Sequence, residues 1–250
     1  MINFSAVRPE TLAGKIVRYP FRVLPRGIVV PILQGPLRGK KWIVGSHLHG
    51  CWLGSYEWEL QKRMAKEVKP GTTFYDIGAN VGFYSLLAAK LVGSGSVYAI
   101  EPLAANVAYL RRHLELNRVG NVEVMEMAIS DEVGKLAFES EGTRAMGRLG
   151  TAGSALVEGS TLASLLEEGR MAPPDCIKMD IEGAEYRALG AARECFARYR
   201  PKLFLALHGK EVHENCCRLL SSWGYDYQYM SHESEERAEL FAFGRQGEKQ

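Results

Sequence analysis

The stretch FYDIGANVGFYSLLAAK, residues Phe74–Lys90, decides the fold of this chain. It starts as a short apolar run that ends at Asp76, passes through Gly78 and Gly82, and becomes an apolar run compatible with a helix. Glycines at such a turn let the backbone adopt positive φ and approach a ligand closely. The first N–H groups of the helix have no partner within it. The stretch therefore predicts a strand, a tight ligand-binding turn and a helix.

The rest of the chain repeats this alternation of strands and helices, which predicts right-handed crossovers and a mostly parallel sheet with helices on both faces. Two final strands without an intervening helix predict an antiparallel hairpin at the sheet edge. The expected fold class is therefore α/β, with a mostly parallel, Rossmann-like sheet of seven strands. The expected strands are residues 72–77 (TTFYDI), 95–102 (GSVYAIEP), 121–129 (NVEVMEMAI), 175–181 (DCIKMDI), 202–207 (KLFLAL), 225–230 (YDYQYM) and 238–244 (AELFAFG).

Three helix predictions depend on local signals. Ser55 is expected to cap a helix over residues 55–68, and Ser160 a helix over residues 160–169. Residues 184–199 (AEYRALGAARECFARY) are expected to form one helix. Residues 132–160 are rich in Gly and Ser and are expected to form a hairpin or a loop.

Residues 1–50, rich in Pro and Gly, are expected to form an N-terminal extension. Within it, we expect a short helix and two strands, residues 27–33 (GIVVPIL) and 40–44 (KKWIV). Residues 51–250 would then form the main domain.

The composition indicates a folded protein without a general affinity for nucleic acid. The 250 residues carry 31 basic and 29 acidic side chains, so no nucleic-acid partner is expected. Residues 1–45 nevertheless hold eight basic residues against one acid. They form either a solvated arm or a contact surface for an anionic lipid or a phosphorylated substrate, so peripheral membrane contact stays open.

Five cysteines without a C-x-x-C pair indicate reduced, mostly buried thiols. No signal-peptide core is visible, and the run GIVVPIL is too short to span a bilayer. These features predict a cytoplasmic protein, and the sequence predicts no oligomeric state.

The turn after Asp76 is unlike a diphosphate-binding loop. It reads D-x-G-x-N-x-G, with Asn80 where G-x-G-x-x-G has a middle glycine. A carboxylate at Asp76 would repel a diphosphate and attract a cationic or hydroxyl-bearing ligand. Glu101 ends the next expected strand, where an acid accepts hydrogen bonds from two ribose hydroxyls. These features favour a ribose-bearing ligand with a positive centre and no diphosphate, and S-adenosylmethionine fits that description.

Four blocks of the sequence resemble the FkbM-type S-adenosylmethionine-dependent methyltransferases: FYDIGANVGFYS, YAIEP, AISDEVG and IKMDIEGAEYRALGA. The segment GSHLHGCWLGSYEWEL resembles that family's approach to the first strand, and the resemblance covers roughly Val30 to Gly209. It implies a class I methyltransferase fold. It also implies that Ser130 and Asp131 lie near the adenine of the cofactor, and that the cofactor site is lined by Asp76, Gly78, Asn80, Gly82 and Glu101.

The segment KMDIEGAE supplies the candidates for chemistry. Asp180 and Glu182 follow the fourth expected strand, and they are the ligands we would assign to a divalent metal if one takes part. Glu182 and Glu185 could instead stabilise a helix N-terminus. Lys178, a metal ion or the sulfonium would offset the repulsion between the acids. His208, at the end of the fifth strand, is a candidate base, or a structural residue.

Two further features bear on the substrate. The family commonly has Glu two residues before His208, and this chain has Ala206. The motif [DN]-P-P-[YF] of amino-group methylation is absent, and MDIE occupies its place, which favours oxygen as the acceptor atom.

A third feature is the cluster His47-x-His49-x-Cys51, which is more typical of a loop over the substrate than of a zinc site.

The resulting prediction is an O-methyltransferase that acts on a hydroxyl of a sugar, a glycan or a secondary metabolite. The catalytic candidates are Asp180, Glu182 and His208. Two alternatives stay open: an RNA methyltransferase that uses the basic arm, and a binding module that has lost catalysis.

Overall fold

The computed structural model describes residues 24–140, 147–149, 155–234 and 237–245. The expected N-terminal helix, and much of the basic segment, lie outside the described residues. The helices are α2 (His49–Leu53), α3 (Trp58–Glu67), α4 (Phe83–Val92), α5 (Ala104–Leu116), α6 (Leu162–Glu167), α7 (Glu185–Gly190), α8 (Arg193–Tyr199) and α9 (Lys210–Ser222). The strands are β1 (Val29–Pro31), β2 (Lys41–Ile43), β3 (Phe74–Ile77), β4 (Val97–Ile100), β5 (Val122–Met125), β6 (Ala128–Ile129), β7 (Gly134–Ser140), β8 (Gly147–Leu149), β9 (Ala155–Ser160), β10 (Cys176–Met179), β11 (Lys202–His208), β12 (Tyr225–Ser234) and β13 (Arg237–Gly244).

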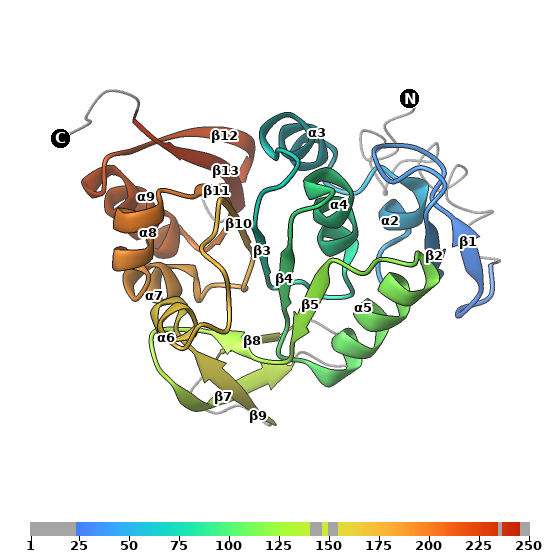
Figure 1. Cartoon of the computed structure of the whole chain (residues 1–250), viewed down its shortest axis with the longest axis horizontal. Coiled ribbons are helices and arrows are strands. Elements are labelled where there is room, and N and C mark those ends of the chain that lie inside the picture. The colour runs from blue at the N-terminus through green and yellow to red at the C-terminus, as the bar shows by residue number, and fades with distance from the viewer. Residues whose placement is uncertain (1–23, 141–146, 150–154, 235–236, 246–250) are drawn as a thin grey trace.

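In the described ranges, seven strands form the central sheet, in the order β12-β13-β11-β10-β3-β4-β5 (Figure 1). The strands from β11 to β5 in this order are parallel to one another. β13 runs antiparallel to β11 and pairs with β12 as a hairpin. The α/β class, the parallel sheet and the terminal hairpin are therefore confirmed.

Alternating side chains on the strands build two separate apolar layers. Phe74 and Phe204 pack with residues of α3 and α4 on one face of the central sheet. Tyr75 and Leu205 pack with residues of α6, α7, α8 and α9 on the other. Figure 1 shows α4 and α5 to one side of the sheet and α7, α8 and α9 to the other. Both faces of the parallel strands are buried, as crossover helices require.

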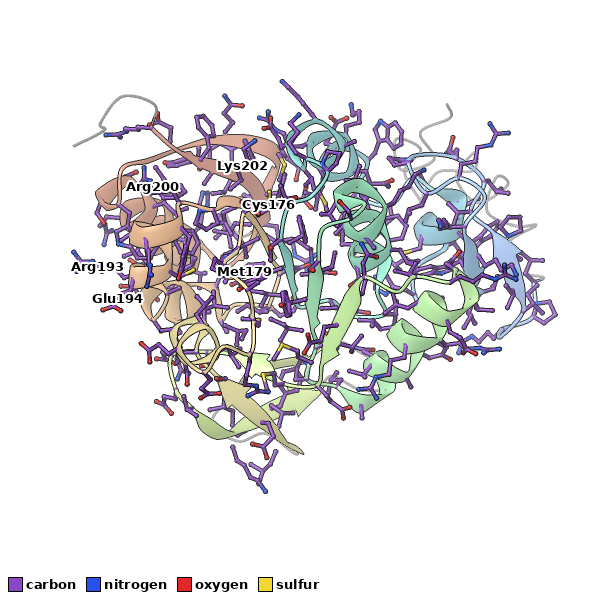
Figure 2. All side chains as sticks on the ribbon, viewed as in Figure 1. Cys176, Met179, Arg193, Glu194, Arg200 and Lys202 are labelled. Atoms are coloured by element: carbon purple, nitrogen blue, oxygen red, sulfur yellow. The ribbon has the colours of Figure 1, made fainter. Side chains whose placement is uncertain are left out.

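The carboxyl ends of the parallel strands meet at one edge. In Figure 2, Cys176 and Met179 mark the two ends of β10, which runs down the view. At the lower edge lies a smaller sheet, which the described residues build in the order β6-β9-β7-β8 (Figure 1). Ligands of such sheets bind beyond the carboxyl ends of the strands, so this edge is where a site is expected.

The third expected strand was wrong in its extent. Residues 121–129 form β5, which joins the central sheet, and then β6, which leaves it. Ala128 and Ile129 pair with Gly159 and Ser160 of β9 rather than with β4. The pairing with β9, which lies about 30 residues further along the chain, thus decides where the expected third strand breaks.

Three helix predictions were also wrong in detail. Thr161, not Ser160, caps α6, and its side chain accepts a hydrogen bond from the Ser164 N–H. Ser55 does not cap α3, which begins after Glu57 in a left-handed conformation at φ 41°. Residues 184–199 form α7 and α8 instead of one helix, with the break at residues 191–192.

The cysteine prediction is confirmed for the described residues. The five cysteines, all of which lie there, are free thiols, and only Cys217 is not fully buried. The same residues contain no helix that is both long and apolar enough to span a membrane.

The two strands expected in the N-terminal segment are confirmed as the antiparallel pair β1 and β2. Trp42 of β2 is fully buried and stacks on the imidazole of His113 in α5, with 3.9 Å between ring centroids. The His113 Nδ1–H donates to the Val81 carbonyl (2.8 Å), and Nε2 accepts from the Ile43 N–H (3.1 Å). His113 thus joins the N-terminal strands to the turn after β3. We retain the division of the chain at residue 50 as a proposal.

The position of His113 predicts a loss of stability in mild acid. Burial lowers its pKa to about 4, whereas an unfolded histidine titrates near 6.5. As the pH falls below 6.5, the unfolded chain therefore takes up a proton that the folded chain excludes. The free energy of unfolding should fall by about 2 kcal/mol through this residue between pH 7 and pH 5.

Urea unfolding at both pH values would measure this loss. His113→Gln can keep a donor and an acceptor but does not titrate. The stability difference between wild type and this variant isolates His113 from the other titrating groups. Stability curves that run parallel from pH 7 to pH 5 would contradict the prediction.

Candidate active site

A cleft opens at the carboxyl edge of the central sheet. Its walls come from segments far apart in the sequence, which the crossovers bring to one edge. The lining residues are 77–81, Phe83, Tyr84, 100–103, Asn106, 127–129, Lys178 and 180–182, together with His47, Tyr56 and Phe138.

The turn after β3 forms the floor of the cleft. Gly78 has φ +77°, and its missing side chain leaves room for the backbone of Asp180, because a Cβ there would lie 1.9 Å from the Asp180 carbonyl oxygen. Asn80 also has positive φ, and its side chain accepts a hydrogen bond from the Val81 N–H. Gly82 lies behind the turn, where a Cβ would come within 3.0 Å of Leu110. Gly78 and Asn80 thus line the cleft, and Gly82 allows α5 to pack against the turn.

Glu101 follows β4 and is 5% exposed on the wall beside this turn. Its Oε2 accepts from the Asn80 N–H (2.9 Å), and its Oε1 accepts from the Leu103 N–H (3.1 Å) and from Asn106 (3.0 Å). Burial raises the pKa of Glu101, and these hydrogen bonds oppose the rise. A carboxylate has about four acceptor positions, so about one remains for a ligand rather than the two that we expected.

Asp76 is fully buried beneath the cleft and is not among the described residues that line it. Its Oδ2 accepts from the Ser85 hydroxyl (2.6 Å), and its Oδ1 lies 3.7 Å from Lys178 Nζ. The Lys178 Nζ also lies 3.4 Å from Asp180 Oδ2 and from the Gly78 carbonyl. Asp76 therefore fixes a buried lysine that itself reaches the cleft.

Lys178 is the cation among these acids. Burial opposes its charge, but Asp180 and Asp76 outweigh burial and hold the pKa of Lys178 above its ordinary value. Lys178 therefore offsets part of the negative charge at this end of the cleft.

Asp180, Glu182 and His208 come together at the ends of the neighbouring strands β10 and β11. The His208 Nε2 lies 3.7 Å from Asp180 Oδ1 and 3.5 Å from Glu182 Oε2. The His208 Nδ1 lies 3.0 Å from Glu185 Oε1. Asp180 and Glu182 line the cleft, and His208 stands behind them.

Glu185 begins α7, but its side chain does more than compensate the helix dipole. It is fully buried, and its carboxylate accepts the Ile181 N–H and the Gly183 N–H as well as His208. This carboxylate therefore ties the loop that carries Glu182 to the end of β11.

The charge of His208 affects its suitability as a base. Burial alone would lower its pKa, but the hydrogen bond to Glu185 and the charges of Asp180 and Glu182 raise it to about 9. While His208 faces only these carboxylates, the ring therefore holds a second proton on Nε2 at neutral pH, and a cation bound there would have to displace it. Such a ring is a poor proton acceptor.

Ser130 and Asp131 follow β6 but are not among the described wall residues. Ser130 is fully buried and donates to Asp131 Oδ1 (2.9 Å). Arg187 of α7 donates to the same oxygen (2.9 Å) and lowers the pKa of Asp131. The residues just before them, 127–129, face the cleft instead.

The sequence did not predict the aromatic residues that line the cleft, which are Tyr56, Phe83, Tyr84 and Phe138. His47, in contrast, belongs to the predicted loop over the substrate and does line the cleft. Its neighbour His49 accepts a hydrogen bond from Trp52, and Cys51 is fully buried. Only Asp180, Glu182 and His208 form a ligand group of metal type within the described residues, so the H-x-H-x-C cluster is not one.

Glu57, which follows the wall residue Tyr56 in the sequence, lies near Asp180. Burial and the charge of Asp180 raise the pKa of Glu57 to about 7.

A parallel sheet closed by an antiparallel hairpin, with a cleft beyond the ends of β3, β4 and β10, defines the class I fold of the S-adenosylmethionine-dependent methyltransferases. The family described as methyltransferase FkbM domain matches residues 76–227, which is more than half of the chain. The chain belongs to this family.

Two curated relatives are similar over part of their length. The hexuronic acid methyltransferase AglP of Haloferax volcanii is 24% identical over 135 residues, which cover 53% of this chain and 55% of AglP. The 31-O-demethyl-FK506 methyltransferase FkbM of Streptomyces tacrolimicus is 34% identical over 83 residues, 32% of each chain. The chain thus spans about half of the first relative and a third of the second.

Among solved structures, the methyltransferase FkbM of Methylobacillus flagellatus KT shares the fold with a TM-score of 0.50 and 18% identity. The similarity covers 79% of this chain and 56% of that one.

Proposed function

We propose that this protein transfers the methyl group of S-adenosylmethionine to a hydroxyl group of a sugar or glycan. The observation that carries the proposal is one cleft with two chemically different ends. Glu101 and the turn at residues 78–80 form one end, and Asp180, Glu182 and Lys178 form the other. The first end suits a nucleoside, and the second suits an acceptor that must lose a proton.

We place the cofactor at the end of the cleft that contains Glu101, because the carboxylate of Glu101 can accept about one more hydrogen bond. A ribose hydroxyl would donate to Glu101 Oε2, while the backbone at Gly78 and Asn80 passes close to the rest of the nucleoside. Asp76 and Gly82 would act through the shape of the turn rather than by contact. Ser130 and Asp131 would bound the adenine end through residues 127–129.

The chemistry needed at the other end is simple. In an in-line displacement, the bond from sulfur to the methyl carbon breaks as the bond from oxygen to that carbon forms, and the hydroxyl proton leaves. Alignment of the two reacting groups can supply roughly 7–11 kcal/mol of the barrier. Asp180 and Glu182 would orient the hydroxyl and receive its proton, and Lys178 would fix the Asp180 carboxylate.

The relatives and the polarity of this end support the proposed acceptor class. AglP is named for a hexuronic acid, and the Streptomyces relative for methylation of an oxygen. Carboxylates that accept hydrogen bonds suit a polyhydroxylated acceptor. The aromatic walls Tyr56 and Phe138 offer flat apolar surface of the kind that small-molecule sites use.

Methyl-labelled S-adenosylmethionine would test the proposal in two arms. Calorimetry should first show one cofactor site per chain, and the absence of any binding heat would end the proposal. The label should then enter the methyl glycoside of glucose or of glucuronic acid, and Asp180→Asn should abolish the transfer. Methyl ethers survive alkali whereas methyl esters do not, so a label that alkali releases would contradict transfer to a hydroxyl. Transfer to neither glycoside would contradict the sugar acceptor.

A further inference from the structure

We propose that Asp180, Glu182 and His208 bind one divalent metal ion at the acceptor end of the cleft, and that Glu185 positions the histidine. The three donor atoms lie within 4.8 Å of one another. Sequence reasoning assigned only the two acids to a metal and treated His208 as a base. The geometry instead points to His208 as the third ligand.

The spacing of the donor atoms supports an ion between them. The Nε2 of His208 is 3.5 Å from Glu182 Oε2 and 3.7 Å from Asp180 Oδ1, both longer than a hydrogen bond. Two ligands held at about 2.1 Å by one ion lie roughly 3.0 Å apart on adjacent octahedral positions and roughly 3.4 Å apart at a tetrahedral angle. The two separations from His208 Nε2 thus exceed the tetrahedral value by at most roughly 0.3 Å.

Glu185, on the Nδ1 side of the His208 ring, provides an independent observation. Glu185 is fully buried and accepts the Nδ1–H of His208 at 3.0 Å, so Nε2 is the nitrogen left facing the two acids. A carboxylate behind a histidine that fixes its tautomer is the usual support for a metal ligand. The backbone N–H groups of Ile181 and Gly183 hold Glu185 in turn.

The backbone also brings Glu182 back toward this group. Glu182 has φ +53°, a left-handed conformation that is uncommon for a non-glycine residue, and Gly183 follows at φ +102°. These two residues reverse the chain directly after β10. The Glu182 carboxylate therefore lies 3.5 Å from His208 Nε2 while its side chain stays 38% exposed.

The local charge favours a cation. Four carboxylates, those of Asp76, Asp180, Glu182 and Glu185, lie around Lys178 and His208. Imidazole suits zinc and iron, and carboxylates suit manganese and magnesium, so one nitrogen and two oxygens fit Mn²⁺ or Zn²⁺. Three protein ligands leave a coordination position for an acceptor oxygen, whose proton a bound cation makes easier to remove. This role rests on the proposed function, whereas binding of the ion does not.

Titration of the full chain with Mn²⁺, followed by the electron paramagnetic resonance signal of free Mn²⁺, tests the site without any methyl transfer. We expect one ion per chain, displaced by Zn²⁺. His208→Gln and Glu182→Gln should each weaken binding at least ten-fold, and Glu185→Gln about ten-fold through loss of positioning. Glu214→Gln, an exposed acid on α9, should leave binding unchanged.

Glu182 is half-buried at the surface, so its variant should fold even if the buried Glu185 does not tolerate change. Circular dichroism would verify the fold of each variant. No binding of either ion to the wild type, or equal binding by a folded His208→Gln or Glu182→Gln, would overturn the metal site. Intact metal binding without methyl transfer would contradict the proposed function and leave the ion site standing.

Discussion

Replacement of Glu101 by alanine should raise the dissociation constant for S-adenosylmethionine about 100-fold. A hydrogen bond to a charged group contributes roughly 1.5–3 kcal/mol, and each 1.4 kcal/mol is ten-fold in affinity. The substitution would also leave the N–H groups of Asn80 and Leu103 without their acceptor, so the turn would lose its fixed shape. Both effects weaken the same end of the cleft.

Calorimetry on matched variants would measure this effect. Glu101→Gln keeps the size of the side chain and one acceptor oxygen, so its affinity should lie between those of the wild type and Glu101→Ala. Glu123→Ala removes an exposed acid on β5 and should bind as the wild type does. Equal affinities of Glu101→Ala and Glu123→Ala would show that Glu101 does not hold the cofactor.

The elements that the sequence predicted best are those whose partners follow from the alternation of strands and helices. A strand, a turn with glycines and a helix over residues 74–90 are all present, and the antiparallel hairpin β12–β13 closes the sheet. These features depend on short-range signals, such as the apolar period and the glycines. The third expected strand failed because a distant partner decides its extent: β6 pairs with β9. The helix caps and the break between α7 and α8 failed locally, within one or two residues.

The same distinction applies to the site. Glu101 and Asp180 could be placed because both follow parallel strands, whose ends meet at one edge. Asp76 lies inside β3 rather than after it, and its side chain is on the Phe74 face, where Ser85 and Lys178 bind it. The alternation of the strand could have indicated that face.

Nothing in the local sequence indicates that Tyr56 and Phe138 line the cleft. They come from a loop before α3 and from a strand of the smaller sheet. Their approach to the cleft depends on the packing of the whole chain.

The last prediction concerns Gly78, in the turn after β3, where we propose that the cofactor binds. Gly78→Ala should lower the free energy of unfolding by at least about 4 kcal/mol, a loss typical of severe strain in a core. An added Cβ would lie 1.9 Å from the Asp180 carbonyl oxygen and 2.9 Å from its carbon, both backbone atoms. The carboxyl ends of β3 and β10 would have to separate, and the Asp180 side chain would move with them.

Gly71→Ala provides the matched control, because Gly71 has a similar φ of +83° and nothing within 4 Å of an added Cβ. The free energy of unfolding of Gly71→Ala should fall only by what a positive φ costs a residue with a Cβ, roughly 1–2 kcal/mol. The difference between the two variants in urea unfolding therefore measures the clash alone. If both lost the same free energy, the close contact between Gly78 and Asp180 would not exist in solution. The cofactor turn would then be free to move independently of the acids at the other end of the cleft.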